Sequence, residues 1–189
     1  MGFFENLFKN ELNSFAKKMS KEVYEYSFHT VNILISSEQS LPDEYENSTI
    51  SWEKVSNEKT KWKLINEFQV FILYTLGRQA LGILSDNKYK KFMDIITEET
   101  INNTPKIDEK IIARRYQEYI QYEIIPVNEN LESNPEEIEN SAIGRFSYHL
   151  SKILNEKIDP MYDGLSLYNL VITFCKSQNT KERLLSLNK

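Results

Sequence analysis

The chain has 189 residues, of which 40% are hydrophobic and 27% are charged, a composition typical of a soluble globular protein. Its net charge of −5 argues against a protein built to bind nucleic acid or anionic lipid, because those partners require a concentrated positive surface. No run reaches the ~18 to 20 apolar residues that a membrane-spanning helix needs. We therefore expect a single domain over residues 1–189, with no nucleic-acid partner and no transmembrane segment.

The single cysteine, Cys175, allows no internal disulfide and falls on an apolar face, so we expect it in the core. A secretory signal peptide needs an uninterrupted apolar stretch, which Glu5 and Lys9 break in the opening segment. These two observations predict a cytoplasmic protein.

The opening segment has the clearest helical pattern in the sequence. Apolar positions recur at intervals of three and four residues, which predicts one buried stripe on a helix over about residues 3–37. The stripe consists of Phe4, Phe8, Leu12, Phe15, Met19, Val23, Tyr26, Thr30 and Ile33. A second stripe begins at Tyr24, so we expect the later half of this helix to be covered on two sides.

The start of this helix gathers four large apolar side chains. Phe3, Phe4, Leu7 and Phe8 offer a surface to another protein or to a second copy of the chain. Residues 2–19 also have the pattern of a helix that lies on a membrane surface. Their three lysines are nearly balanced by two glutamates, however, which gives little attraction to anionic lipid. A protein partner is therefore the favoured expectation for this segment.

All five prolines lie between amphipathic segments. Pro105, Pro135 and Pro160 each follow a residue type that caps helices, and we expect each to open a helix. With three earlier helices, they predict an all-α, single-domain bundle of about six helices around a central hydrophobic helix at about 58–84. A long irregular connection at about 38–58 is expected to be a surface crossover, with a mobile lid as the alternative.

The central helix is apolar nearly all round, which predicts burial on every side. It also contains Gly77 and Gly82, each of which lowers helix propensity by about 1 kcal/mol relative to alanine. We expect a neighbouring element to approach closely at these two positions, where a side chain would be in the way.

Three polar residues of the first helix are the catalytic candidates. Glu22, Glu25 and His29 lie on one stripe, and the spacing of four would let Glu25 orient or charge the imidazole. An ordinary intrahelical pair explains the same spacing and is favoured. The sequence has no His-Glu-x-x-His motif, no Glu-x-x-His pairs of a di-metal bundle and no Gly-rich phosphate loop. We therefore expect no metal and no cofactor.

Tyrosines recur every three residues at 116, 119 and 122, beside the pair Arg114-Arg115. Tyrosine and arginine are enriched at binding surfaces, so Arg114, Arg115 and Tyr119 are the ligand-binding candidates. The same rings also fill helical cores with their hydroxyls at the edge, and that interpretation is favoured.

Together these patterns favour a small helical protein that acts through protein–protein interaction or self-association, as an adaptor, regulator or inhibitor. The lack of a catalytic motif and the apolar opening segment support this function over an enzyme. The alternative is an enzyme or a small-ligand or metal binder, with a pocket between helices where Glu22, Glu25 and His29 meet Arg114 or Arg115.

Overall fold

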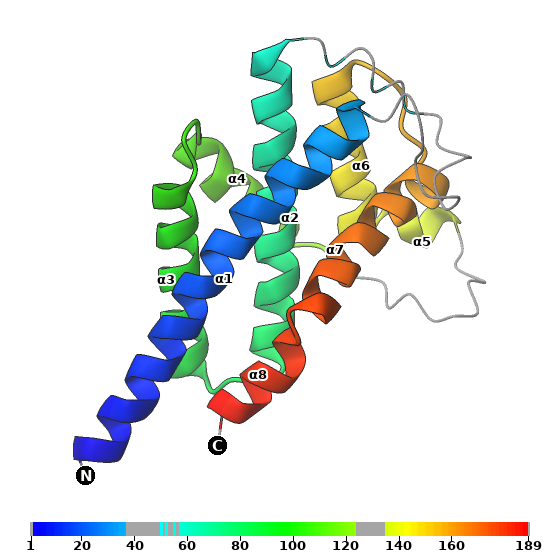
Figure 1. The fold of residues 1–189 in the computed structure, drawn as a ribbon. Coiled ribbons are helices and arrows are strands. Elements are labelled where there is room, and N and C mark those ends of the chain that lie inside the picture. Colours follow the sequence, from blue (N-terminus) through cyan, green and yellow to red (C-terminus); the bar gives the residue numbers. More distant parts are fainter. Residues whose placement is uncertain are drawn as a thin grey trace.

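The computed structural model describes residues 2–36, 50, 52, 55, 57–123 and 135–188, with side chains from residue 10 onward. Regular structure within these ranges is helical throughout, which confirms the predicted all-α bundle (Figure 1). The helices are α1 (Gly2–Ser36), α2 (Glu58–Leu81), α3 (Asp86–Asn103), α4 (Glu109–Tyr119), α5 (Pro135–Glu139), α6 (Ala142–Leu154), α7 (Leu165–Ser177) and α8 (Thr180–Leu187), with a π-helical turn η3 (Pro160–Gly164) between α6 and α7.

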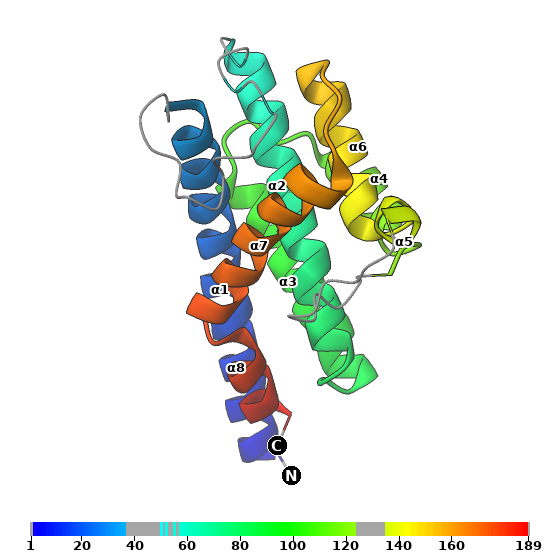
Figure 2. The ribbon, with the colours of Figure 1, turned by 90° about the vertical axis from the view of Figure 1, so that its right-hand side faces the viewer.

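The helix α2 is the axis of the bundle. Every residue from Leu64 to Gly77 is buried, including the charged side chain of Glu67. The helices α1, α3, α4, α6, α7 and α8 all pack against it, so that it is enclosed in both views (Figures 1 and 2). The prediction of a central hydrophobic helix is therefore confirmed, because an apolar surface that runs all round a helix needs neighbours on every side.

The helix α1 crosses α2 obliquely and packs along α3 (Figure 1). Leu12, Met19 and Val23 on the predicted stripe are buried. Toward the end of α1 the buried side turns, because the crossing brings a different face of the helix against the bundle. Ile33 is 56% exposed there, and the buried positions are Thr30, Val31 and Leu34, of which Thr30 alone belongs to the predicted stripe.

The predicted helix start at Pro105 is wrong. Thr104 ends α3, and Pro105 lies in the turn that follows it. The first turn of α4 is instead capped by Asp108, whose side chain accepts a hydrogen bond from the backbone N of Ile111 at 3.1 Å. A capping residue three positions after Pro105 thus sets the start of α4.

Pro135 and Pro160 do open helical segments, as predicted. The helix predicted from Pro135 is divided into α5 and α6, and α8 lies beyond residue 178, where the helix predicted from Pro160 is expected to end, so the described part of the chain has more than six helices. Ser141 caps α6 through its hydroxyl oxygen and so separates it from α5. Asn179, with a left-handed φ of 49°, separates α7 from α8 through its backbone conformation. At Ser141, a short polar side chain that binds the backbone interrupts a periodic apolar pattern.

Two predictions concern residues that lie largely outside the described ranges. One is the irregular connection at 38–58, of which Trp52 and Val55 are buried and are joined by a backbone hydrogen bond of 3.0 Å. The other is the partner surface, because the side chains of Phe3, Phe4, Leu7 and Phe8 are outside the described residues. No helix in the described ranges is both long enough and apolar enough to cross a membrane.

The glycines of the bundle differ in what surrounds them. A Cβ on Gly77 would lie 2.7 Å from the Tyr116 hydroxyl and 3.2 Å from the Met93 methyl, so the expected close approach is present there, made by side chains. Gly82 ends α2, and a Cβ there would have no neighbour closer than 3.8 Å, so the expectation is wrong at this position. A Cβ on Gly144 would overlap the backbone carbonyl of Glu139.

Gly144→Ala should therefore destabilise the protein, by about 1–3 kcal/mol, because the backbone between α5 and α6 would have to move. Gly82→Ala is the matched control. Its φ of −78° suits alanine, and a gain of about 0.4–1 kcal/mol is expected from the stiffer unfolded chain. Urea unfolding midpoints measure both, and equal effects of the two substitutions would contradict the described packing.

Candidate functional site

A cluster of six polar side chains joins α2, α4 and α6 in the interior of the bundle. We call it the buried charge network, and it consists of Glu67 from α2, Arg115, Glu118 and Tyr119 from α4, and Arg145 and His149 from α6. The residues from α4, and likewise those from α6, include pairs spaced by three or four positions, which places them on one side of that helix.

Glu67 is the innermost member of the network, with 2% of its surface exposed. The Tyr119 hydroxyl donates a hydrogen bond to its Oε1 at 2.6 Å, and the Arg115 Nε lies 3.3 Å from its Oε2. Burial raises the pKa of Glu67 to about 6, although Tyr119 and Arg115 both act to lower it. Glu67 is therefore mostly ionised at neutral pH, and its two partners offset the cost of a charge inside the core.

Glu118 connects the network to the molecular surface. Its Oε2 lies 3.2 Å from the Nη1 of Arg115, and its Oε1 binds the guanidinium of Arg145. Partial burial acts to raise the pKa of Glu118, but the Arg145 hydrogen bond and the neighbouring positive charge outweigh it and lower the pKa. An ionised Glu118 thus holds α4 and α6 together.

His149 is 1% exposed and lies beside both charged partners. Its Nε2 is 3.2 Å from the Nη1 of Arg115 and 3.2 Å from the Oε2 of Glu118. Burial, with the charge of Arg115, lowers the pKa of His149 to about 4, so the ring is neutral at pH 7. Its Nδ1 is buried and has no hydrogen-bond partner in the described part of the chain. An unpaired acceptor at Nδ1 costs less free energy than an unpaired N–H group would. We therefore place the ring hydrogen on Nε2, which donates it to Glu118.

The catalytic candidates on α1 lie apart from this network. His29 is exposed, and Glu25 forms an ion pair with Lys21 at 3.5 Å. Among the described residues no hydrogen bond or ion pair joins Glu25 to His29, and Glu22 is partly buried on the same helix. The described ranges also contain no group of three or more His, Cys, Asp or Glu side chains placed to hold a metal ion.

The tyrosines at 116, 119 and 122 do not form one surface. Tyr119 is fully buried in the network, whereas Tyr116 and Tyr122 are partly buried. Tyr122 lies beyond the end of α4 at Tyr119, so the three rings do not continue along one helix. Of the ligand-binding candidates, Arg115 and Tyr119 are brought together on Glu67, while Arg114 is exposed.

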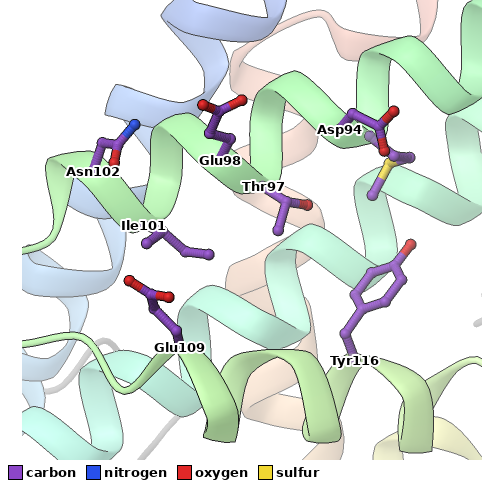
Figure 3. Close-up of a pocket in the computed structure, with 8 residues that line it drawn as sticks. Asp94, Thr97, Glu98, Ile101, Asn102, Glu109 and Tyr116 are labelled. Carbon is purple, nitrogen blue, oxygen red and sulfur yellow. The ribbon is translucent and has the colours of Figure 1, made fainter.

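A groove runs between α3 and α4, with a volume of about 530 Å³ (Figure 3). Thr97 and Ile101 extend from α3 toward α4, and Glu109 and Tyr116 extend from α4 toward α3 (Figure 3). Its lining includes the carboxylates of Asp94, Glu98 and Glu109 and no basic residue. The groove is therefore electrostatically suited to a positively charged group.

The outer side of the network carries an exposed aromatic ring. Tyr148 is 46% exposed, with the guanidinium carbon of Arg145 at 4.4 Å and the Nζ of Lys152 at 5.4 Å from its ring centre. Arg114, also exposed, lies one helical turn before Glu118. We call the surface made by Arg114, Glu118, Arg145, Tyr148 and Lys152 the α4–α6 face.

Sequence reasoning missed four members of the network, Glu67, Glu118, Arg145 and His149. The signal for Glu67 was present, because it is a carboxylate in the middle of the most apolar helix and has to find a buried partner. Glu118 has no such signal, since a glutamate on an amphipathic helix ordinarily faces solvent.

No protein-family model, curated protein or solved structure matches the chain. A function for this chain can therefore be inferred only from the geometry of its described residues.

The depressed pKa of His149 predicts a measurable loss of stability in acid. The unfolded chain binds a proton at a pH near 6.5, whereas the folded state binds it only near 4, so stability falls as the pH drops between these values. The loss is on the order of 3 kcal/mol. Glu67 has the opposite effect on stability. Its pKa in the folded protein, about 6, lies above its ordinary value of 4.5, so its protonation adds stability as the pH falls between these two values. His149→Phe should remove the His149 contribution alone.

The measurement is the free energy of unfolding from urea titrations at several pH values between 7 and 4. The free energy of unfolding of His149→Phe, relative to that of the parent protein, should increase as the pH falls. His29→Phe, at the exposed histidine, is the control. Its free energy of unfolding should change with pH as that of the parent protein does. A pH-independent difference for His149→Phe would contradict a buried, neutral ring.

The Tyr119 hydroxyl provides a second test of the network. Tyr119→Phe should destabilise the fold by about 1.5–3 kcal/mol, because it removes a hydrogen bond to a buried carboxylate. It should also raise the pKa of Glu67 further, since the hydroxyl acts to lower it. Tyr162→Phe, on a ring that is 67% exposed, should change stability by less than about 0.5 kcal/mol. Thermal and urea unfolding of the three proteins provide the comparison.

Proposed function

We propose that the protein acts by binding another protein, and that the α4–α6 face is its contact surface. The observation that supports this proposal most directly is Tyr148, an exposed ring flanked by the cations of Arg145 and Lys152. Tyrosine and arginine contribute most of the binding energy in many protein interfaces, because they combine a large contact area with directional hydrogen bonds.

The buried charge network supports the proposal by ordering this face in advance. Glu118 binds Arg145, and Glu118 is itself held by Arg115, which also contacts the buried Glu67 and His149. An arginine held in this way loses less side-chain entropy when it meets a partner than a freely moving one does. The surface is therefore preorganised for binding.

The charge of the α4–α6 face indicates the chemistry of the partner. Arg114, Arg145 and Lys152 contribute three positive charges against one negative charge from Glu118, in a chain whose net charge is −5. An acidic segment of a partner protein would be attracted to this face and repelled from most of the remaining surface. We expect that segment to combine carboxylates for the cations with an apolar group for Tyr148.

The apolar opening segment remains a second predicted contact surface. Phe3, Phe4, Leu7 and Phe8 precede Leu12, which is 4% exposed on the same helix. Phe4→Glu with Phe8→Glu should abolish association through this segment and leave helicity unchanged. The same change should leave association through the α4–α6 face intact.

Site-specific photo-crosslinking tests the α4–α6 face. A photoreactive phenylalanine analogue at position 148 should produce, in cells of the host organism, one adduct with a defined protein. The same analogue at Tyr162, which is 67% exposed on η3, is the control position and should not produce that adduct.

Charge reversal completes this test. Arg114→Glu and Lys152→Glu should each reduce adduct formation at position 148 by about tenfold, which corresponds to about 1.4 kcal/mol. Lys181→Glu, at an exposed lysine on α8, is the matched control and should have no effect. The proposal would be overturned if positions 148 and 162 formed the same amount of adduct. It would also be overturned if Arg114→Glu left the amount of adduct at position 148 unchanged.

A further inference from the structure

The groove between α3 and α4, which we call the acidic groove, has an apolar floor. The side chains that form this floor are buried or partly buried, and they are those of Met93, Ile101 and Tyr116 (Figure 3). Three exposed carboxylates also line the groove, those of Asp94, Glu98 and Glu109. Within the described ranges none of the three forms an ion pair, and Lys17 pairs with Glu99, next to Glu98, at 2.9 Å. The groove thus combines an apolar contact area with negative charges that lack a cation.

The α4–α6 face has the opposite charge in a similar arrangement. Arg145, Tyr148 and Lys152 are spaced by three and four residues, so they lie on one side of α6. The exposed ring of Tyr148 comes between the two cations along the helix, with Arg145 at 4.4 Å and Lys152 at 5.4 Å from the ring centre. This stripe of α6 therefore has an aromatic ring in the middle and a positive charge on either side.

The stripe and the groove also agree in length. From Arg145 to Lys152 the helix α6 advances by seven residues, which is about 10 Å. The residues of α3 that line the groove run from Met93 to Asn102, which is nine residues or about 13 Å. The stripe can therefore lie within the length of the groove, as an amphipathic helix lies in a complementary groove of its partner.

A chain cannot make this contact with its own groove. Tyr116, which lines the groove, and Arg114, which belongs to the α4–α6 face, are two residues apart on α4. A step of two residues places them about 160° apart around the helix. The groove and the face consequently point in nearly opposite directions, so the face of one chain can reach only the groove of another.

We propose that the α4–α6 face of one copy of the chain docks into the acidic groove of a second copy. The Tyr148 ring packs on the apolar floor, and the cations beside it meet the carboxylates of the groove. This inference rests on the proposed function, whose contact surface it uses, and it names a second copy of the chain as the partner. Each chain carries a net charge of −5, so two copies repel one another elsewhere, which favours this one orientation.

The symmetry of the assembly follows from the position of the two surfaces. A contact between two different surfaces is head-to-tail, and it leaves one groove and one face free in every pair of copies. The groove and the face lie on opposite sides of α4, so the free surfaces accept further copies and the contact continues into a chain or a ring.

Sedimentation velocity of the purified full chain tests this contact. The parent protein should show an average mass that exceeds that of one chain and rises with concentration. Arg114→Glu with Lys152→Glu alters the face, and Asp94→Lys with Glu98→Lys alters the groove. All four positions are exposed, so both variants should fold, which circular dichroism verifies. Each variant alone should self-associate at least about tenfold more weakly than the parent protein.

Mixing the two variants provides the most specific measurement. The face variant retains its groove and the groove variant retains its face, so an equimolar mixture should form a heterodimer and nothing larger. Lys176→Glu with Lys181→Glu, at exposed positions on α7 and α8, is the control. It changes the net charge as much as the face variant does and should assemble as the parent protein does. A parent protein that remains monomeric, or a mixture that does not associate, would overturn the inference.

Photo-crosslinking separates the failure of this inference from the failure of the proposed function. In the purified protein, the photoreactive analogue at position 148 should produce a covalent dimer, linked to a residue of α3 or α4 that lines the groove. A link within one chain, or a link to another part of the second copy, would overturn the inference. An adduct in cells with a different protein would also overturn it, while the α4–α6 face would still be a protein-binding surface. The absence of any adduct would contradict both.

Discussion

The burial of α2 on every side is the constraint on which the rest of the bundle depends. Because no part of its middle reaches solvent, a charged residue can remain there only if another helix brings it a partner. Glu67 is that residue, and α4 brings Arg115 and Tyr119 to it. The only buried side chains of α4 are Ile112 and Tyr119, so polar contacts contribute more to the placement of α4 than they do for the other long helices.

The position of α4 in turn determines the surfaces that the protein offers. One side of the helix borders the acidic groove, and the side toward α6 forms the α4–α6 face. Opposite charges thus lie on two sides of a helix of 11 residues. A partner that recognises one side would be repelled by the other, so the orientation of a complex on this helix is constrained by electrostatics alone.

The apolar pattern predicted the elements well where apolar residues dominate, as in the striped α1 and the uniformly apolar α2. It failed at the start of α4, because Asp108 caps this helix and overrides the proline three positions earlier, at 105. The buried charge network could not be predicted from the sequence for a different reason. Glu67 and Tyr119 are 52 positions apart, and a pattern along one helix indicates which side is buried but not which helix covers it. Arg115 and Tyr119 were identified from residue type, yet their role depends on that distant carboxylate.

The order of synthesis gives α8 a particular importance. This helix is made after every other helix that packs on α2, and it binds α2 through the Thr180 hydroxyl, which donates to Gln79 at 2.7 Å. Arg183 on the same helix covers the ring of Phe15 near the start of α1. On the ribosome, the end of α2 and the early turns of α1 therefore lack their cover until α8 has emerged. The chain can form local helices during translation, but this part of its core is completed only once α8 is free to dock.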